Sequence, residues 1–239
     1  MVISLEKYLW LNNVLARRTG FHLKRAQPSF SLARKYLFDT QRISKVYDCG
    51  ANEGQWLREF RSSVSNEVPV VCFEPLASAV ERLELNTCED QFVQIHQIAL
   101  SNFEGRANLF VASNSGMSSS LRNPQDHLSH YGNVKFSDVQ EVTVARLDSF
   151  LDSSERHYLK IDVQGGEYDL LQSATRTLDT TRVLEIELSL TGRMYAGEVS
   201  TGSILELLEK SGLTIFSLSD VARNRDGACL YIDALLVRR

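Results

Sequence analysis

The sequence has no apolar stretch approaching the roughly 18 residues that a membrane-spanning helix requires. Its first seven residues lack the basic start, apolar core and small-residue cleavage site of a secretory signal peptide. Its four cysteines, Cys49, Cys72, Cys88 and Cys229, form no Cys-x-x-Cys pair, which argues against disulfides and a zinc site. These absences favour a cytoplasmic protein in which Cys49 and Cys72 are small buried apolar residues.

The composition suits one globular domain, or one domain with a small appendage, because the chain has 239 residues and 43% apolar content. Its net charge of −4 is unevenly distributed. Residues 1–45 contain nine Lys or Arg and two acidic residues, so this segment carries +7 and leaves −11 for residues 46–239. An acidic body of this kind argues against a nucleic-acid substrate.

The Gly-x-Gly-x-x-Gly fingerprint of dinucleotide-binding folds is also absent. In its place, an apolar strand runs into the turn Gly50-Ala51-Asn52-Glu53-Gly54, which opens a helix over about 55–61. A second strand, at 70–73, ends on Glu74. In a βαβ unit this order places backbone N–H groups and a carboxylate around a nucleoside-bearing ligand. We expect Glu74 to accept hydrogen bonds from both ribose hydroxyls.

Asp48 indicates which nucleoside the turn would hold. It lies two residues before Gly50, where a carboxylate would repel a pyrophosphate but suits a ligand with an ammonium and a sulfonium. That ligand is S-adenosylmethionine, and Gly50 would let it approach the backbone because no Cβ intervenes. The alternative is a helix N-cap by Asn52 in a glycine-rich turn that binds nothing. We favour the ligand site, because strand, turn, helix and distal acid coincide.

Strands and helices alternate beyond residue 45, which predicts a parallel sheet with helices on both faces. Strands are expected at about 45–49, 70–73, 92–98, 107–112, 141–146, 158–163, 182–188, 214–218 and 229–237, and further helices at about 77–87, 167–178 and 203–210. The last two strands flank the turn 224–227, and such a closing hairpin puts an antiparallel strand into the sheet.

The basic N-terminal segment predicts two helices, at about 5–18 and 29–38, of which the first is amphipathic. One interpretation is that these helices cap the sheet and form part of the substrate mouth. The other is a weak peripheral contact with anionic lipid at the inner face of the membrane. We favour the first, because any appended helix must bury a face somewhere.

Several stretches in the same order resemble the FkbM-type methyltransferases. They are Tyr47-Asp-Cys-Gly-Ala-Asn-Glu-Gly-Gln55, Phe73-Glu-Pro75, Ala99-Leu-Ser101, Leu147-Asp148, Leu159-Lys-Ile-Asp-Val-Gln-Gly165 with Glu167, Glu185-Ile-Glu187, the loop 114–121 and the closing 233–237. The resemblance covers about residue 46 to the C-terminus. The family often carries Glu where this chain has Gln164, so that position receives no acid–base role. Residues 1–45 match no motif.

The resemblance implies an α/β, Rossmann-like class I methyltransferase fold. Its sheet would be seven-stranded and mostly parallel, with one antiparallel C-terminal strand. Residues 46–239 would form the S-adenosylmethionine-binding domain, preceded by a helical appendage at 1–45. The implied activity is O-methylation, and the implied acceptor is a sugar in a bacterial surface polysaccharide or a glycosylated metabolite. The loops at 113–132 and 190–203 would select it.

The matching motifs also assign the donor site. Asp48 and Gly50 should face the methionine end of the donor, and Glu74 its ribose. Ala99 should lie near the adenine. The predicted donor-binding set is Asp48, Gly50, Ala51, Asn52, Gly54, Glu74, Pro75 and Ala99.

Asp162 is the first candidate for acceptor contact or general base, because ligands of open α/β sheets lie beyond the carboxyl ends of the strands. Lys160 shares its strand parity, so the two side chains would face the same side. The alternatives are a structural Lys160–Asp162 pair, or Asp162 capping the helix that follows.

Glu185 and Glu187 lie on one face of a central strand, where two carboxylates are costly unless they are paired. They would either hydrogen-bond acceptor hydroxyls or pair with Lys160 or Arg193, and Glu187 is the better acceptor candidate because it lies nearer the strand end. Asp162 with Glu185 or Glu187 would suit a divalent cation, but no spacing demands one and no metal is predicted.

The serines at 118–120, together with His127 and His130, are a candidate lid. His127 is an alternative base, because an imidazole titrates near neutrality. Both histidines are also compatible with ordinary exposed loop positions.

Two rival functions stay open. An NAD-dependent sugar oxidoreductase is disfavoured by the glycine spacing and by Asp48. A methyltransferase-like binding module without activity is disfavoured by the presence of Asp48, Gly50, Glu74 and Asp162 together.

Overall fold

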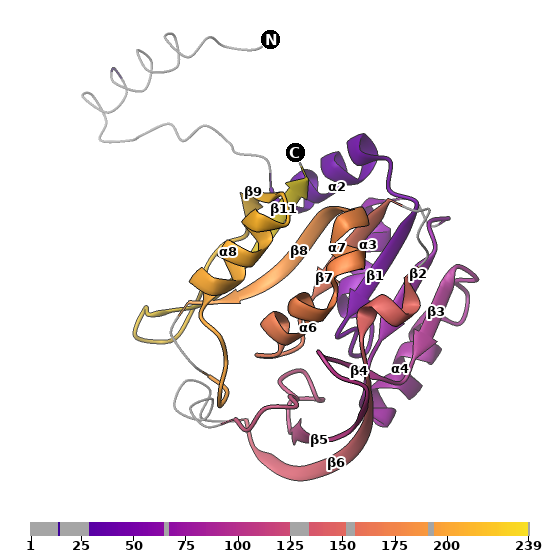
Figure 1. The fold of residues 1–239 in the computed structure, drawn as a ribbon, viewed down its shortest axis with the longest axis vertical. Helices are drawn as coiled ribbons and strands as arrows, with labels where there is room; N and C mark the ends of the chain where they lie inside the picture. Colours follow the sequence, from indigo (N-terminus) through magenta and orange to yellow (C-terminus); the bar gives the residue numbers. More distant parts are fainter. Residues whose placement is uncertain are drawn as a thin grey trace.

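The computed structural model describes residues 14, 29–64, 67–124, 134–151, 156–190 and 194–238 (Figure 1). The helix predicted over 5–18 therefore lies outside the described residues, apart from residue 14. So do His127, His130 and Arg193, to which the sequence assigned a base, a lid and an ion pair.

A mostly parallel sheet forms the centre of the described part of the chain (Figure 1). Its strands lie in the order β10-β11-β8-β7-β1-β2-β3, and β9 pairs with β11. β11 runs antiparallel to both β8 and β9, whereas β8, β7, β1, β2 and β3 are parallel. The strands are β1 (Lys45–Cys49), β2 (Val70–Phe73), β3 (Val93–His96), β7 (His157–Ile161), β8 (Thr181–Ser189), β9 (Leu213–Leu218), β10 (Ala222–Arg223) and β11 (Cys229–Arg238). This confirms the predicted fold class, with the short β10 as an eighth strand.

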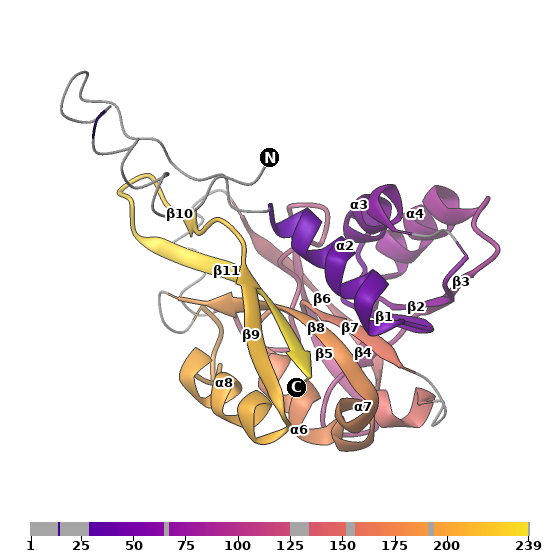
Figure 2. The same ribbon diagram turned by 90° about the horizontal axis from the view of Figure 1, so that it is seen from above.

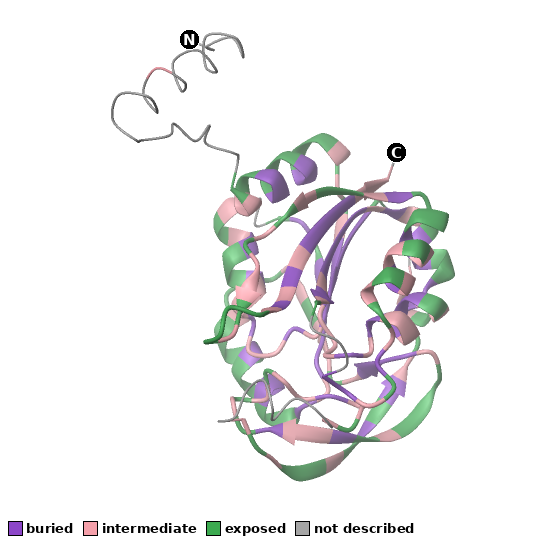
Figure 3. Ribbon diagram, turned by 90° about the vertical axis from the view of Figure 1, so that its left-hand side faces the viewer, coloured by how far each residue is buried: buried purple, intermediate pink, exposed green. Residues whose placement is uncertain are grey.

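Helices cover both faces of the sheet (Figure 2). One layer consists of α2 (Phe30–Gln41), α3 (Gln55–Ser63) and α4 (Ala77–Thr87). The other consists of α6 (Glu167–Ser173), α7 (Thr175–Thr180) and α8 (Thr201–Lys210). Each layer packs its own apolar cluster against the sheet. The central strands are consequently buried on both faces, while the outward sides of the helices are exposed (Figure 3).

The helix predicted over 167–178 is wrong in one respect, because the structure has two helices separated at Ala174. The second begins where the Asp148 carboxylate accepts hydrogen bonds from the backbone N–H groups of Arg176 and Thr177, at 3.0 and 2.8 Å. Asp148 follows Leu147 in the short 3-10 helix η1 (Leu147–Phe150). A side chain distant in sequence thus satisfies orphan donors that the local pattern does not reveal.

The predicted third strand is also shorter than expected. β3 ends at His96, and Ala99 lies in β4 (Ala99–Leu100) of a second, three-stranded sheet. The other strands of that sheet are β5 (Gly105–Ala112) and β6 (Phe136–Ala145), in the order β4-β6-β5. This sheet has its own apolar cluster, which includes Ala99 and Leu109.

The second N-terminal helix forms as predicted and packs onto the sheet. Ser29 caps it, since its side-chain oxygen accepts from the Leu32 N–H at 3.3 Å. Its inward side buries Ala33, Leu37 and Phe38 in the cluster shared with α3 and α4, and it also buries the charged Arg34. No helix in the described ranges is long and apolar enough to span a bilayer.

Candidate active site

A cavity of about 520 Å³ lies beyond the carboxyl ends of β1, β2 and β7 and beside the end of β8. Gly50 follows β1, Glu74 follows β2 and Asp162 follows β7, and all three line the cavity with Glu187 from β8. Parallel strands bring their ends to one edge of the sheet, so residues far apart in sequence converge there. This is the position that the sequence predicted for the site.

The turn after β1 places Gly50, Ala51 and Asn52 on the cavity wall. Gly50 has φ +85°, and a Cβ added to it would lie 1.8 Å from the carbonyl oxygen of Asp162. The reason given for this glycine from the sequence was therefore wrong. The loop after β7, rather than a ligand, occupies the space where a side chain would be. Gly54 does not line the cavity. It precedes α3 with φ +84°, and its Cβ would meet the Leu83 side chain at 2.8 Å.

Glu74 is held in a fixed orientation by the backbone. One carboxylate oxygen accepts from the Asn52 N–H and the other from the Leu76 N–H, both at 2.9 Å. The residue is buried but borders the cavity. Burial raises the pKa of its carboxyl to about 7 against the opposing effect of these two hydrogen bonds. Each oxygen retains a lone pair, so Glu74 has the capacity to accept from two neighbouring hydroxyls.

Asp48 does not border the cavity. It is fully buried in β1, and its Oδ1 lies 3.3 Å from the ammonium of Lys160, which does line the cavity. Lys160 Nζ also donates to the carbonyl of Gly50 at 3.0 Å. Burial opposes the charged ammonium, but the carboxylates of Asp48 and Asp162 hold the pKa of Lys160 above its ordinary value. The group that borders the cavity here is therefore the ammonium of Lys160, whose charge Asp48 and Asp162 balance. The expectation that Asp48 itself faces the ligand is corrected accordingly.

Asp162 lies at the cavity just after β7. Its Oδ2 is 3.5 Å from Lys160 Nζ, and its Oδ1 accepts from Gln164 Nε2 at 2.7 Å. Gln164 adopts φ +51°, and its side-chain oxygen accepts from the Tyr195 hydroxyl at 2.9 Å. The carboxylate is thus oriented from both sides. The structural Lys160–Asp162 pair considered from the sequence is present, and Asp162 borders the cavity as well.

Glu187 has fewer partners. Gln164 Nε2 lies 3.4 Å from its Oε1, so one amide group reaches both Asp162 and Glu187. Asp233 of β11 is the register partner of Glu187 and also lines the cavity. Burial, followed by the charges of Asp162, Glu167 and Asp233, raises the pKa of Glu187 well above its usual value. A carboxylate of this kind is a stronger base than a free one.

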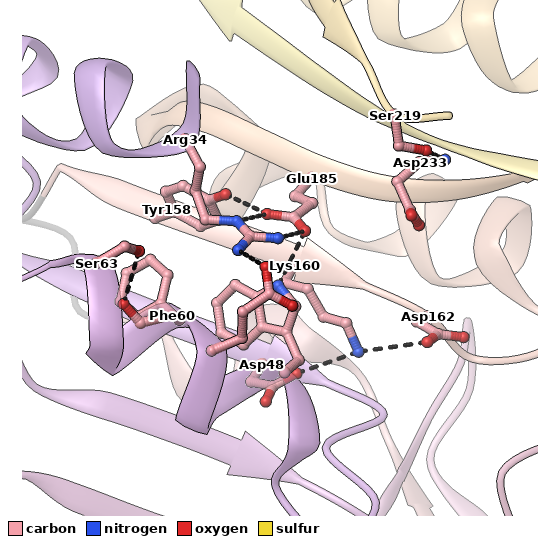
Figure 4. A network of polar contacts seen from close by, with 12 residues as sticks. Arg34, Asp48, Phe60, Ser63, Tyr158, Lys160, Asp162, Glu185, Ser219 and Asp233 are labelled. Carbon is pink, nitrogen blue, oxygen red and sulfur yellow. Dashed lines mark hydrogen bonds and ion pairs between the residues drawn. The ribbon is translucent and has the colours of Figure 1, made fainter. Parts of the chain in front are cut away.

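Glu185 is saturated by partners that the sequence did not suggest (Figure 4). Arg34 of α2 donates from Nε at 2.9 Å and from a terminal nitrogen at 2.7 Å. Trp56 Nε1 donates at 2.9 Å, and the Tyr158 hydroxyl donates as well. Lys160, one of the partners expected for Glu185, is not among these donors, and the other, Arg193, lies outside the described residues. Glu185 lines the cavity, but these donors occupy both of its oxygens, which favours the paired alternative over contact with acceptor hydroxyls.

The remaining wall comes from the second sheet and the loop after β5. Pro75, Ile98, Ala99, Leu100 and Leu109 provide an apolar side, and the serines at 118–120 border the same space. Ser120 donates to the carbonyl of Gln164 at 2.6 Å, which ties this loop to the loop after β7. Whether the serine loop acts as a lid stays a prediction.

Sequence reasoning missed Arg34, Tyr195 and Asp233. Arg34 lies in the segment that matched no motif, and its partner Glu185 is 151 residues away. Tyr195 holds Gln164, and it precedes the helix α8 in a loop without a recognisable pattern. Asp233 had a signal, because it opens the matching stretch 233–237 and faces a strand that carries Glu187.

The described residues contain no group of three or more His, Cys, Asp or Glu side chains arranged to hold a metal ion.

The cavity fits S-adenosylmethionine on several independent features. Glu74 offers two oriented acceptors for a ribose diol, and the Ala99 side offers an apolar surface for a planar base. Lys160 and Asp162 at the end of β7, together with Asp48 on the neighbouring β1, carry one net negative formal charge, which suits a cationic ligand. The volume of the cavity lies within the range of ordinary ligand pockets.

Comparison with known proteins identifies related sequences. The family model described as "Methyltransferase FkbM domain" matches residues 48–213. The 2-O-methyltransferase NoeI of Sinorhizobium fredii (strain NBRC 101917 / NGR234) is 29% identical over 172 residues, which cover 68% of this chain and 70% of that protein.

Solved structures show weaker likeness. An rRNA methylase from Streptococcus thermophilus has a TM-score of 0.48 at 10% identity, covering 90% of this chain and 99% of that one. Magnesium protoporphyrin IX methyltransferase from Synechocystis PCC 6803, with bound S-adenosylmethionine, has a TM-score of 0.45 at 10% identity and covers both chains fully.

Proposed function

We propose that this chain, which belongs to the FkbM methyltransferase family, is an O-methyltransferase that acts on a hydroxyl of a sugar, a glycan or a related small metabolite. S-adenosylmethionine is the methyl donor of such enzymes. The observation that carries the proposal is the cavity in which Glu74, the turn after β1 and the acids after β7 and β8 converge.

Glu74, Asn52 and the Ala99 side would hold the donor. Glu74 is already oriented by two backbone N–H groups, so binding a ribose diol requires little further ordering of this side chain. When bound, S-adenosylmethionine supplies a methyl group made electrophilic by the adjacent sulfonium. Fixing two reactants in this way accounts for much of the acceleration, since positioning contributes about 7–11 kcal/mol.

The acceptor hydroxyl would bind between Asp162 and Glu187. Asp162 is held by Lys160 and Gln164, which suits it to accept a hydrogen bond and orient the acceptor. Glu187 has a raised pKa and, within the part of the chain that the structure describes, one long hydrogen bond, from Gln164, which suits it to take the hydroxyl proton as the new C–O bond forms. General base catalysis of this kind typically contributes 10²–10⁴-fold. Lys160 stays protonated, so it acts by holding Asp162 and not as a base.

The choice of a sugar hydroxyl rests on two supports. The related NoeI protein is a 2-O-methyltransferase. In addition, Glu187 and Asp233 line the acceptor side of the cavity next to each other, and carboxylates accept hydrogen bonds from hydroxyl groups.

Calorimetry and mass spectrometry test the proposal together. S-adenosylhomocysteine should bind to the purified protein and NAD should not, which separates a methyltransferase from an oxidoreductase. Glycans from cells with and without the protein should differ by about 14 Da, the mass of one added CH₂. Binding of S-adenosylhomocysteine without any such difference, and without transfer of labelled methyl groups to glycan extracts, would leave a binding module instead.

A further inference from the structure

A row of charged side chains crosses three neighbouring strands at the wall of the cavity, where Lys160 and Glu185 line it and Asp48 lies behind them. Asp48 on β1 is the register partner of Lys160 on β7, and Lys160 is the register partner of Glu185 on β8. Register partners in a sheet project from the same face. Lys160 therefore stands between two carboxylates, and the one it pairs with decides where its ammonium lies.

Glu185 is fully occupied on its other side. Arg34, Trp56 and Tyr158 provide four donors, two for each carboxylate oxygen. A carboxylate has about four lone-pair positions, so no acceptor capacity is left for Lys160. Arg34 is the cation in this group, and its remaining terminal nitrogen donates to Glu59 at 2.8 Å. The Arg34 side chain is only 4% exposed.

The ammonium of Lys160 consequently points the other way, between Asp48 and Asp162 (Figure 4). It also binds the Gly50 carbonyl. Gly50 and Asp162 both line the cavity, at the end where the methionine part of the donor is expected. The arrangement of this end thus depends on Glu185 being satisfied elsewhere.

We propose that Arg34 is a positioning residue for the donor and acceptor site, because by holding Glu185 it reserves Lys160 for Asp48, Asp162 and the Gly50 carbonyl. This inference rests on the proposed function. Arg34 precedes the region matched by the family model, which begins at residue 48. It makes α2 part of the functional unit of this chain rather than a separable appendage.

Loss of Arg34 would leave Glu185 buried with neutral donors and no cation. An uncompensated buried charge is strongly unfavourable. Lys160, its neighbour in register, is the nearest candidate to compensate it. The ammonium would then leave Asp162 and Gly50, and the cavity would lose the arrangement that binds the donor.

Three variants test this, with S-adenosylhomocysteine as the probe and calorimetry below the melting temperature as the measurement. Arg34→Met should weaken binding about tenfold or more, which is about 1.4 kcal/mol. The double variant Arg34→Met with Glu185→Gln removes the uncompensated charge. Its affinity for S-adenosylhomocysteine should therefore return to within about threefold of that of the unsubstituted protein, even if its melting temperature stays lower. Lys35→Met removes a charge from the exposed side of the same helix, where Lys35 pairs with Asp39, and should bind like the unsubstituted protein.

The outcomes separate cleanly. Unchanged binding by folded Arg34→Met overturns the inference. Equal loss in the single and double variants also overturns it, because Arg34 would then act through packing alone. Where Arg34→Met does not fold, the double variant decides the matter by binding or failing to bind. If the unsubstituted protein binds no S-adenosylhomocysteine, the proposed function fails and takes the inference with it, whereas a failure confined to the variants leaves the proposed function intact.

Discussion

Lys160 Nζ lies 3.3 Å from Asp48 Oδ1, and the Asp48 side chain is completely buried behind it. The carboxylate that the sequence placed at the ligand is thus a support for the lysine that meets the cavity. Together with Asp162, the two residues form a small charged unit with one net negative charge. The site still favours a cationic donor, but the net negative charge of all three residues, and not Asp48 alone, is the reason.

Glu74→Gln should weaken S-adenosylhomocysteine binding about 10- to 100-fold. Hydrogen bonds to a charged group contribute roughly 1.5–3 kcal/mol, and the amide replaces one acceptor with a donor. Glu53→Gln is the matched control, because Glu53 lies in the same turn, pairs with Arg82 and does not line the cavity. Calorimetry on both variants makes the comparison, and equal affinities would remove Glu74 from the donor site.

The pH dependence of donor binding should follow the same carboxyl. Its pKa in the free protein is raised to about 7 by burial. Below pH 7 it is protonated, and a ligand that needs the ionised form must displace the proton. S-adenosylhomocysteine affinity should therefore fall about tenfold per pH unit below 7 and level off above it. The affinity of Glu74→Gln should not fall with pH in this way. The same fall in that variant would contradict the assignment of Glu74 to the donor site.

Glu187→Gln and Asp162→Asn should change different kinetic parameters. If Glu187 takes the proton, its variant loses about 10²–10⁴-fold in kcat and binds S-adenosylhomocysteine normally. If Asp162 orients the acceptor, its variant raises the KM for the acceptor and retains the pH profile of kcat. Steady-state kinetics over pH 6–9 on an acceptor glycan that is not yet methylated distinguishes the two. A lost kcat in Asp162→Asn with an unaffected Glu187→Gln would reverse the roles.

The sequence indicated which residues would line the cavity wherever its signals are local. The strand–turn–helix at 45–63 and the acid after β2 follow from apolar runs, glycines and a carboxylate that lie close together in sequence. The hydrogen bonds that orient Glu74 were not predicted, because one of its donors, the Asn52 N–H, lies in the turn after β1. Asp162, Glu187 and Ala99 reach the cavity because strand order brings them there.

Hydrogen-bond and ion-pair partners that lie far apart in the sequence could not be predicted from it. Nothing near Glu185 indicates that Arg34, from a helix with no recognisable motif, would occupy both its oxygens. The burial of Asp48 was hidden for the same reason, since its partner Lys160 comes from a neighbouring strand. The break at Ala174 depends on Asp148, which also comes from a distant segment. Tertiary contacts overrode the local pattern in each case.

Glu167 predicts how stability should vary with pH. It accepts from the Val163 and Gly165 N–H groups at 3.1 Å, yet burial raises its pKa to about 7. Between about pH 4.5 and 7 the unfolded chain releases this proton and the folded protein keeps it, so stability should decline as pH rises through this window and be constant above it. Glu167→Gln should remove up to roughly 3 kcal/mol of that decline.

Denaturant unfolding at pH 5, 6, 7 and 8 measures this change in slope. Part of the decline should remain in Glu167→Gln, because the pKa values of Glu74 and Asp233 are also raised, to about 7 and about 6. An unaltered slope in Glu167→Gln would show that this carboxyl titrates normally in the folded protein.

Two features of the structure require glycine at position 50, its positive φ and the lack of space for a Cβ, and Gly50→Ala tests them. Its φ of +85° is unfavourable for alanine by about 1–2 kcal/mol, and its Cβ would in addition meet the Asp162 carbonyl at 1.8 Å. Gly227 has φ +86° with nothing within 4 Å of its Cβ position, so Gly227→Ala carries the conformational cost alone. Gly50→Ala should be destabilised by several kcal/mol more than Gly227→Ala, or fail to fold, because backbone must move. Comparable unfolding free energies in the two variants would mean that the loop after β7 shifts freely. Asp162 would then not be held where the proposed acceptor geometry requires it.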